Sequence, residues 1–327
     1  MKNQIINEIQ RKMLPYLNNE QLLHLKAVLE ASFQGVIIEM GEEQPKAEEQ
    51  DSAAAFITAK RIEGCSEKTL AYYSKTIEAM LNGVGKSPQQ ITTDDLRKYL
   101  TDYQTRRRSS KVTIDNIRRI LSSFFSWLED EDFIVKSPVR RIHKVKTAKI
   151  IKETYTDEAL ELMRDNCSTV RDLAIIDLLS SSGMRVGELV TLNREDINFN
   201  ERECVVLGKG NKERWVYFDA RTKIHLQNYL DERSDSNPAL FVTLKEPHER
   251  LMIGGVETML RELGRRLKLN KVHPHKFRRT LATSAIDKGM PIEQVQQLLG
   301  HQKIDTTMHY AMVKQQNVKL AHRKFIG

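Results

Sequence analysis

The sequence has few cysteines and no long apolar run. Its three cysteines, Cys65, Cys167 and Cys204, are scattered along 327 residues, which excludes a disulfide framework and a paired CxxC metal site. No run of about 18 apolar residues occurs, so we expect no membrane-spanning helix. The opening MKNQIINEIQRKM lacks the apolar core of a secretory signal. These absences predict a protein of the prokaryotic cytoplasm.

Two patterns that suggest a bound phosphate or metal are incomplete. GVGKS at residues 83–87 resembles a phosphate-binding loop, but Met80 stands where that loop needs a glycine and Pro88 follows. We interpret it as a turn between helices. Four histidines fall at 273, 275, 301 and 309, with no Cys, Asp or Glu beside them at ligand spacing and no HExxH motif. We therefore expect neither a metal ion nor another cofactor.

Positive charge is concentrated in the middle of the chain. The net charge is +8, but residues 1–51 hold five Lys/Arg against nine Asp/Glu, a net of −4, which leaves +12 for the rest. Residues 97–146 hold thirteen Lys/Arg against six Asp/Glu, a net of +7. This excess favours a nucleic-acid partner over a merely solvated face. The candidate DNA-binding residues are Arg106, Arg107, Arg108, Lys111, Arg118, Arg119, Arg140 and Arg141.

Apolar spacing divides the chain into two domains and an extension. Residues 1–39 repeat apolar side chains at helical spacing, and the acidic stretch 40–51 indicates a linker. Residues 52–142 predict four amphipathic helices, with an N-cap at Ser66 and another at Thr92 or Thr93. A basic hinge, 143–149, leads to residues 150–327, where two β-rich runs, 204–207 and 214–218, predict a hairpin among helices. The fold class is mainly α with a small β-sheet.

Four short motifs in the last segment carry chemically useful side chains. SSGMRVGEL places Arg185 at the start of a helix with Glu188 one turn on, and GKGNKER places Lys209 and Lys212 at the hairpin tip. HPHKFRR puts His275 and Arg278 on one helix face, and LLGHQKIDTTMHYA supplies His301 and Tyr310. Each motif alone is explained by a surface ion pair or a solvated turn.

Together the motifs point to phosphodiester chemistry. Two planar, permanently charged guanidinium groups can bind the non-bridging oxygens of a phosphate. A tyrosine can form a covalent intermediate, a lysine can protonate a leaving oxygen, and histidines can relay protons. Phosphoryl transfer depends mainly on positioning and charge stabilisation, which this set provides.

The ordered set Arg185, Lys209, His275, Arg278, His301 and Tyr310 resembles the tyrosine recombinase, or phage integrase, family, and is most similar to its Xer-type and transposon-integrase members. The similarity covers about residues 52–325. It implies a helical core-binding domain and an α+β catalytic domain that close on double-stranded DNA as a C-shaped clamp. It also implies monomers that assemble as a homo-tetramer on two recombination sites. Residues 1–51 lie outside the similarity, and their acidity favours contact with an accessory protein.

The resemblance assigns a role to each residue. Arg185 and Arg278 would bind the scissile phosphate, His301 would hydrogen-bond it, and Glu188 would support Arg185. Lys209 would be the general acid and His275 the general base or proton relay. Tyr310 would be the nucleophile that forms a 3′-phosphotyrosyl link without metal or ATP. We expect it on a mobile polar segment, in a short helix capped by Asp305 or Thr306.

Two alternatives remain open from the sequence. A topoisomerase uses the same chemistry, and a DNA-binding relative without catalysis would keep the basic surface alone. The intact set of catalytic positions argues against the second.

Overall fold

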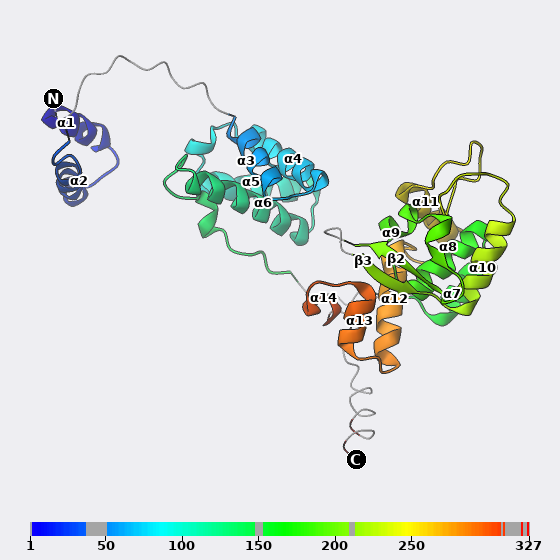
Figure 1. The fold of residues 1–327 in the computed structure, drawn as a ribbon. Helices are drawn as coiled ribbons and strands as arrows, with labels where there is room; N and C mark the ends of the chain where they lie inside the picture. Colours follow the sequence, from blue (N-terminus) through cyan, green and yellow to red (C-terminus); the bar gives the residue numbers. More distant parts are fainter. Residues whose placement is uncertain are drawn as a thin grey trace. The chain divides into compact units, whose positions relative to one another are not determined.

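The computed structural model describes residues 2–36, 51–147, 153–208 and 213–308, together with residues 310, 322 and 326. The chain divides into two compact units, Met1–Lys149 and Ile150–Gly327. The described elements of the first unit are all helical (Figure 1): α1 (Lys2–Met13), α2 (Asn19–Ser32), α3 (Ser52–Ile62), α4 (Glu67–Val84), η1 (Pro88–Gln90), α5 (Thr93–Arg107), α6 (Lys111–Asp130) and η2 (Pro138–Arg141). Within the described ranges, no helix has the length and apolar character needed to span a membrane.

Helices α1 and α2 form a hairpin that buries little apolar surface. Asn18 caps α2 by accepting from the Gln21 backbone N–H at 2.9 Å, and the Gln21 side chain accepts from the Asn18 N–H at 3.1 Å. Among the described side chains of this hairpin, Ile6 is the one buried hydrophobic, whereas Tyr16 and Leu23 are exposed. The apolar spacing correctly predicts helices here, but the described side chains of these two helices do not form a hydrophobic core.

Helices α3 to α6 enclose the core of the first unit. Each begins at a side chain that accepts a hydrogen bond from the first turn: Asp51, Ser66, Thr92 and Ser110. The cap predicted at Ser66 is confirmed, and Thr92 rather than Thr93 caps α5. Helix α6 buries Phe124 and Phe125 completely, and each such side chain contributes about 1.5–3 kcal/mol.

The segment GVGKS is a helix end. Gly85 is the C-cap of α4 and has φ +68°, a conformation that glycine adopts without strain. The interpretation of GVGKS as a turn between helices is therefore confirmed.

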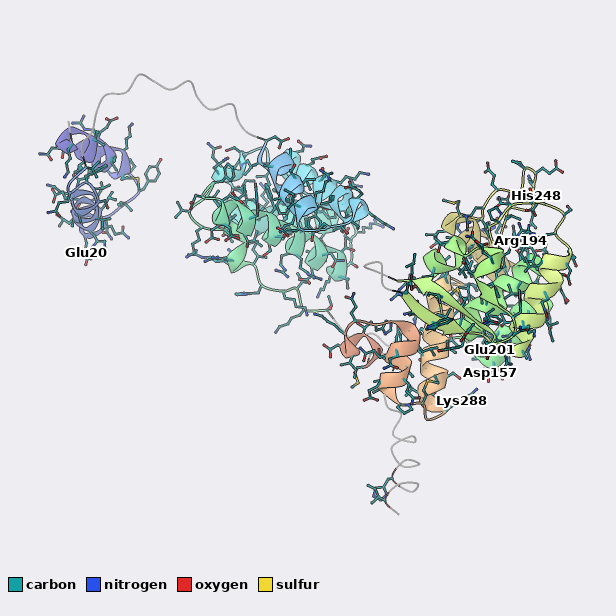
Figure 2. All side chains as sticks on the ribbon, in the orientation of Figure 1. Glu20, Asp157, Arg194, Glu201, His248 and Lys288 are labelled. Carbon is teal, nitrogen blue, oxygen red and sulfur yellow. The ribbon has the colours of Figure 1, made fainter. Side chains whose placement is uncertain are left out.

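The second unit combines helices with a three-stranded sheet (Figure 1). Its elements are α7 (Asp157–Asp165), α8 (Val170–Ser182), α9 (Val186–Thr191), η3 (Arg194–Asp196), β1 (Ile197–Asn198), β2 (Glu203–Leu207), β3 (Glu213–Tyr217), α10 (Ala220–Asp231), α11 (Ile253–Arg266), α12 (Pro274–Asp287), α13 (Ile292–Leu299) and α14 (Ile304–Met308). Side chains of these elements are drawn in Figure 2, where Lys288 marks the C-cap of α12.

The sheet is antiparallel in the order β1-β2-β3, and Cys204 lies opposite Val216. Cys204, Val206 and Val216 face the core, whereas Trp215 and Tyr217 are exposed, as the period of a strand requires. The predicted hairpin is confirmed, and the short strand β1 adds a third strand that the sequence pattern did not predict.

Helix α8 is the central element of this core. It packs against α10, α12 and β3, and α13 packs against both α12 and β3. Figure 1 shows α12 and α13 next to each other below the sheet. The ends of α8 and α13 and the start of α9 therefore come close together.

The first described residues of this unit run along α12. The Tyr155 N–H donates to Thr280 Oγ1 at 2.9 Å, and the Tyr155 hydroxyl accepts from the His273 N–H at 3.1 Å. Arg279 Nη1 donates to the Glu153 carbonyl at 2.9 Å. Tyr155 is buried against Phe277 with ring centroids 4.8 Å apart. The chain therefore enters the second unit fastened to α12.

Candidate active site

The C-terminal end of α13 brings together two of the predicted arginines. Arg278 Nη2 donates to the Leu299 carbonyl, and Arg185 Nη2 donates to the Gly300 carbonyl at 3.5 Å. The last carbonyls of a helix have no intrahelical partners and carry the negative end of its dipole, so they attract cations. Gly300, with φ +63°, is the C-cap of α13. Two arginines from separate helices therefore point at one short stretch of backbone.

Arg185 is held at the start of α9 by Glu188. The Arg185 N–H donates to Glu188 Oε2 and Nη1 donates to Oε1, both at 2.7 Å. The Glu188 side chain is only 4% exposed, so the pair is not the surface ion pair that spacing alone suggests. Burial raises the pKa of Glu188, but hydrogen bonds from Arg214 and Arg185 outweigh it, and the net pKa is lowered. The carboxylate is thus ionised at neutral pH.

Arg278 is a buried cation. Its residue is 4% exposed, and Nη1 donates to the Gly183 carbonyl at 2.7 Å. Burial, followed by the charges of Arg185 and Arg214, lowers the pKa of Arg278 to about 10. The group remains positive at neutral pH, close to a second positive charge. An anion bound between the two guanidinium groups would relieve this repulsion.

Both predicted histidines are biased toward the neutral form. His275 precedes Arg278 by one turn of α12, and part of its side chain is exposed to solvent. Partial burial and the charges of Arg278 and Arg185 lower the pKa of His275. The same causes lower the pKa of His301 to about 4, and its Nδ1 lies 2.9 Å from Thr307 Oγ1. Neutral imidazoles can accept or relay protons near pH 7.

Tyr310 lies beside His301. Their rings stack with centroids 5.9 Å apart and an interplanar angle of 27°. The Tyr310 N–H donates to the Thr307 carbonyl at 2.9 Å. The Tyr310 ring also packs against a small apolar cluster: Ala282, Ala285, Val295 and Leu299. The structure thus holds this tyrosine partly against apolar side chains, while the mobility expected of its polar segment stays a prediction.

The helix before Tyr310 begins earlier than predicted. Helix α14 starts at Ile304, so Asp305 and Thr306 lie inside it and neither caps it. The Thr306 N–H already donates to the Lys303 carbonyl at 3.1 Å. A local turn therefore starts the helix without the predicted side-chain cap.

The predicted general acid lies outside the described residues. The general acid predicted from the sequence is Lys209, at the hairpin tip. Lys212 at the same tip and His309 near the C-terminus also lie outside the described residues. Strands β2 and β3 on either side of the tip are described, and Leu207 pairs with Glu213 across its base.

The predicted DNA-binding residues of the first unit differ in their surroundings. Those that are exposed are Arg106, Arg107, Arg108, Lys111, Arg119, Arg140 and Arg141, with Arg140 in an ion pair with Glu129 at 2.8 Å. Arg118 is half-buried, and its Nε donates to Asp115 Oδ1 at 2.9 Å. The same carboxylate oxygen accepts from the Val145 N–H at 3.1 Å. Arg118 therefore has a structural role, because it shares Asp115 with the backbone of Val145, which follows η2.

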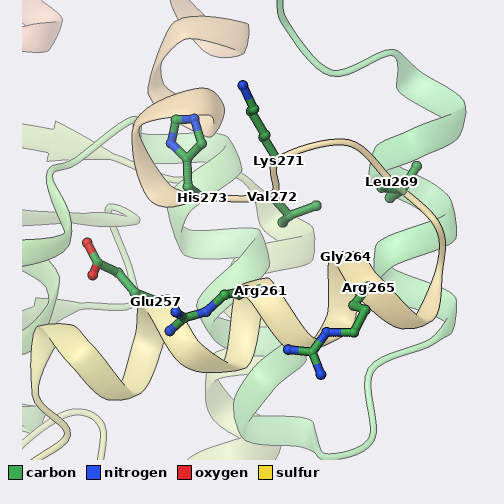
Figure 3. A pocket seen from close by; sticks show the side chains of 8 residues that line it. All are labelled: Glu257, Arg261, Gly264, Arg265, Leu269, Lys271, Val272 and His273. Carbon is green, nitrogen blue, oxygen red and sulfur yellow. The ribbon is translucent and has the colours of Figure 1, made fainter. Parts of the chain in front are cut away.

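A basic cleft lies between α11 and the segment that leads into α12. Its volume is about 630 Å³, and Figure 3 shows the side chains that line it: Glu257, Arg261, Gly264, Arg265, Leu269, Lys271, Val272 and His273. His273, which lines the cleft, is the N-cap of α12 and lies two positions before His275. The cleft thus adjoins the site, and three of its side chains carry positive charge. Motif spacing did not reveal it because its residues form no compact motif.

Arg214 of β3 is a further site residue that the sequence motifs did not predict. Its Nη2 donates to Glu188 Oε2 at 2.9 Å, and its side chain is 11% exposed. The available signal was strand alternation, which turns Arg214 and Val216 to the same, inner face. An arginine directed inward needs an acidic partner, and Glu188 is the carboxylate it meets.

Two family models match the chain. The phage integrase family matches residues 149–317, and the N-terminal SAM-like domain of phage integrases matches residues 53–134. With the fold and the site described above, these matches define an enzyme that breaks and rejoins DNA strands by means of a tyrosine. The first match covers more than half of the residues, and the chain belongs to the phage integrase family of tyrosine recombinases. The predicted family, fold class and enzyme class are confirmed.

Individual relatives agree with this assignment. The chain is similar to tyrosine recombinase XerC of Leptospira interrogans, with 33% identity over 291 residues that cover 84% of this chain and 92% of the relative. It is 30% identical to tyrosine recombinase XerC of Staphylococcus aureus over 280 residues, covering 81% and 93%.

Solved structures share the fold. The XerH site-specific recombinase bound to palindromic difH substrate, a post-cleavage complex, gives a TM-score of 0.67 at 19% identity and covers 97% of this chain and 93% of that one. The Tn1549 transposon integrase in complex with a circular intermediate DNA gives a TM-score of 0.67 at 17% identity, with 84% and 98% covered.

Proposed function

We propose that this recombinase cleaves DNA with Tyr310 as its nucleophile. Arg185 and Arg278 bind the non-bridging oxygens of the scissile phosphate, and His301 donates a further hydrogen bond to them. His275 accepts the tyrosine proton directly or through a relay. The observation that carries this proposal is that Arg185 and Arg278 both turn to the end of α13, directly before His301.

The reaction exchanges one phosphodiester for another. The Tyr310 oxygen attacks phosphorus and displaces the 5′-oxygen, which leaves as a hydroxyl after Lys209 supplies its proton. A 3′-phosphotyrosyl bond replaces the cleaved bond. A 5′-hydroxyl from a partner strand then attacks this bond and releases the tyrosine. Because bond energy is conserved, the exchange needs no ATP, and the arginines supply the charge stabilisation that a metal ion could otherwise provide.

DNA is held by both units in this proposal. The exposed basic residues of the first unit contact phosphates on one side of the duplex, and Arg261, Arg265 and Lys271 of the cleft contact phosphates beside the active site. Monomers assemble as a tetramer on two recombination sites and close on the duplex as a clamp. The acidic residues 1–51 contact an accessory protein rather than DNA, because their net charge of −4 repels phosphates.

Covalent capture tests the proposed function. The full chain is incubated with fragmented genomic DNA of its host, covalent complexes are purified under denaturing conditions, and the attached ends are sequenced to map the site. A nicked suicide duplex carrying that site should attach to the wild type through a 3′-phosphotyrosyl bond.

Matched variants separate the alternatives. Tyr310→Phe should bind this duplex and not attach, whereas attachment by Tyr310→Phe would remove the nucleophile assignment. Binding by the wild type without attachment to any DNA would favour the non-catalytic alternative. Plasmids carrying two mapped sites distinguish recombination from simple relaxation, because only a recombinase changes the restriction pattern.

A further inference from the structure

Arg214 lies near the predicted phosphate site, on strand β3, which follows the hairpin tip. It lies opposite Val206 in the sheet, and its Nη2 donates to Glu188 Oε2 at 2.9 Å. The same oxygen accepts from the Arg185 N–H at 2.7 Å. The other oxygen, Oε1, accepts from Arg185 Nη1 at 2.7 Å. One carboxylate therefore joins β3 to the start of α9.

The Arg214 side chain also packs against the C-terminal end of α13. Its Nε donates to the Leu298 carbonyl at 3.3 Å. A Cβ atom added to Gly300 would lie 2.5 Å from Arg214 Cδ, closer than real side chains approach. The absence of a side chain at residue 300 thus makes room for Arg214. Three successive carbonyls at the end of α13 each accept from a different arginine: Arg214, Arg278 and Arg185.

This arrangement is poorly suited to stability alone. Arg185 and Arg214 both pair with the buried carboxylate of Glu188, and the buried Arg278 donates to two carbonyls, so these four groups carry three positive charges and one negative charge. The charge of Arg214 also helps to lower the pKa of Arg278 and of His301. Like charges kept together in a partly buried place destabilise the folded state unless an anion joins them.

We propose that Arg214 is a positioning residue that acts through Glu188 to aim the Arg185 guanidinium at the scissile phosphate. This inference rests on the proposed function, in which Arg185 binds that phosphate. Arg185 is 31% exposed, and its longest hydrogen bond, to the Gly300 carbonyl, is 3.5 Å, so the backbone alone holds it weakly. Arg214 fixes one oxygen of Glu188, which leaves the other oxygen directed at Arg185 Nη1. Without Arg214, the Glu188 carboxylate can rotate, and the Arg185 guanidinium is no longer held in the orientation that faces the phosphate.

The test compares two forms of the mapped suicide duplex. One carries the natural scissile phosphodiester, and the other carries a methylphosphonate, whose phosphorus centre is neutral. A neutral centre has no charge for a guanidinium to balance, so misplacement of Arg185 should matter little for it. Rates of covalent attachment are measured in single turnovers at saturating protein.

Arg214→Gln should slow attachment to the phosphodiester by about 10²-fold, a loss typical of misplaced catalytic groups. Arg214→Lys keeps the charge but cannot reach Glu188 and Leu298 together, so it should fall between Arg214→Gln and the wild type. On the methylphosphonate, both variants should react within about twofold of the wild type, because the group they misplace is no longer required. DNA affinity should stay unchanged for both.

Arg233→Gln is the matched control. Arg233 is 4% exposed, donates to Asp235 and to several carbonyls, and belongs to the loop after α10 rather than to the site. This variant should melt at a lower temperature and show the same relative rate on both substrates. If Arg214→Gln does not fold, the ratio of the two rates for Arg214→Lys decides the question.

Two results would overturn the inference: a wild-type rate for Arg214→Gln on the phosphodiester, or an equal loss on both substrates. Failure of the wild type to attach to the phosphodiester would instead remove the proposed function itself, together with the role of Arg214.

Discussion

Arg185 and Arg278 direct their guanidinium groups at neighbouring carbonyls, those of Gly300 and Leu299, although they belong to different helices. The backbone at the end of α13 thus organises two side chains that repel each other. A phosphate that binds between them would replace part of this backbone contact with stronger, charge-assisted hydrogen bonds. In the proposed function, the scissile phosphate would therefore meet two guanidinium groups that the backbone already holds in place.

Glu188→Gln should lower the free energy of unfolding by about 3 kcal/mol, because it leaves the Arg185 and Arg214 cations without their buried anion. The pKa of Glu188 is lowered in the folded protein, so its contribution is present above the ordinary value of 4.5 and is lost as the pH falls below it. Urea unfolding between pH 3 and 7 should show a smaller acid-side decline for the variant than for the wild type.

Glu161→Gln is the control for that measurement. Glu161 pairs with Arg164 and Arg221, but its side chain is 53% exposed. Its loss should cost less than about 1 kcal/mol, as exposed ion pairs do. Equal losses for the two variants would contradict the structural role given to Glu188.

The pH dependence of DNA cleavage should follow His275. Partial burial and the charges of Arg278 and Arg185 lower its pKa, so this proposed general base stays neutral below the ordinary value of 6.5. The acidic limb of the single-turnover rate should have its midpoint below pH 6.5, and His275→Gln should remove this limb while slowing cleavage. A midpoint above 6.5 would show that another group titrates.

Gly300→Ala should slow DNA cleavage, because the new Cβ would collide with the Arg214 side chain. Gly289→Ala is a matched control, since Gly289 also has a positive φ, +95°, but an added Cβ there meets nothing within 4 Å. Both variants should lose about 1 kcal/mol of stability from backbone strain. Only Gly300→Ala should cleave more slowly when folded, as measured by covalent attachment after correction for the folded fraction.

DNA affinity should fall steeply with salt, because cationic side chains release counterions from phosphates. Replacing Arg106, Arg107 and Arg108 together by Ala should reduce the slope of log affinity against log salt by up to about 3, at about 0.9 per lost contact. Arg118→Ala should chiefly reduce thermal stability, because Arg118 is tied to Asp115. An unchanged slope for the triple variant would remove these residues from the interface.

The local parts of the site are readable from the sequence. Arg185 and Glu188 are three residues apart at a helix start, and His275 and Arg278 share one turn, so spacing alone relates the members of each pair. The caps at Ser66 and Thr92 follow from the same local chemistry. Family resemblance then joins the separate motifs into one site.

The contacts between motifs are not readable in this way. Arg214 meets Glu188 of α9 across 26 residues and Leu298 of α13 across 84 residues, so only the tertiary packing of β3 brings them together. Residue spacing also suggests that Glu188 forms a surface ion pair with Arg185, whereas the Glu188 side chain is buried in the structure. Helix α14 begins at Ile304 through a backbone turn. The sequence has no preferred capping residue directly before it that would predict this start.

The fastening of Glu153 and Tyr155 to α12 has a mechanical consequence. Residues 153–155, the first described residues of the second unit, lie along the helix that carries His275 and Arg278. A shift of residues 153–155 would therefore displace α12 first, and with it the two side chains that the proposed function places at the scissile phosphate.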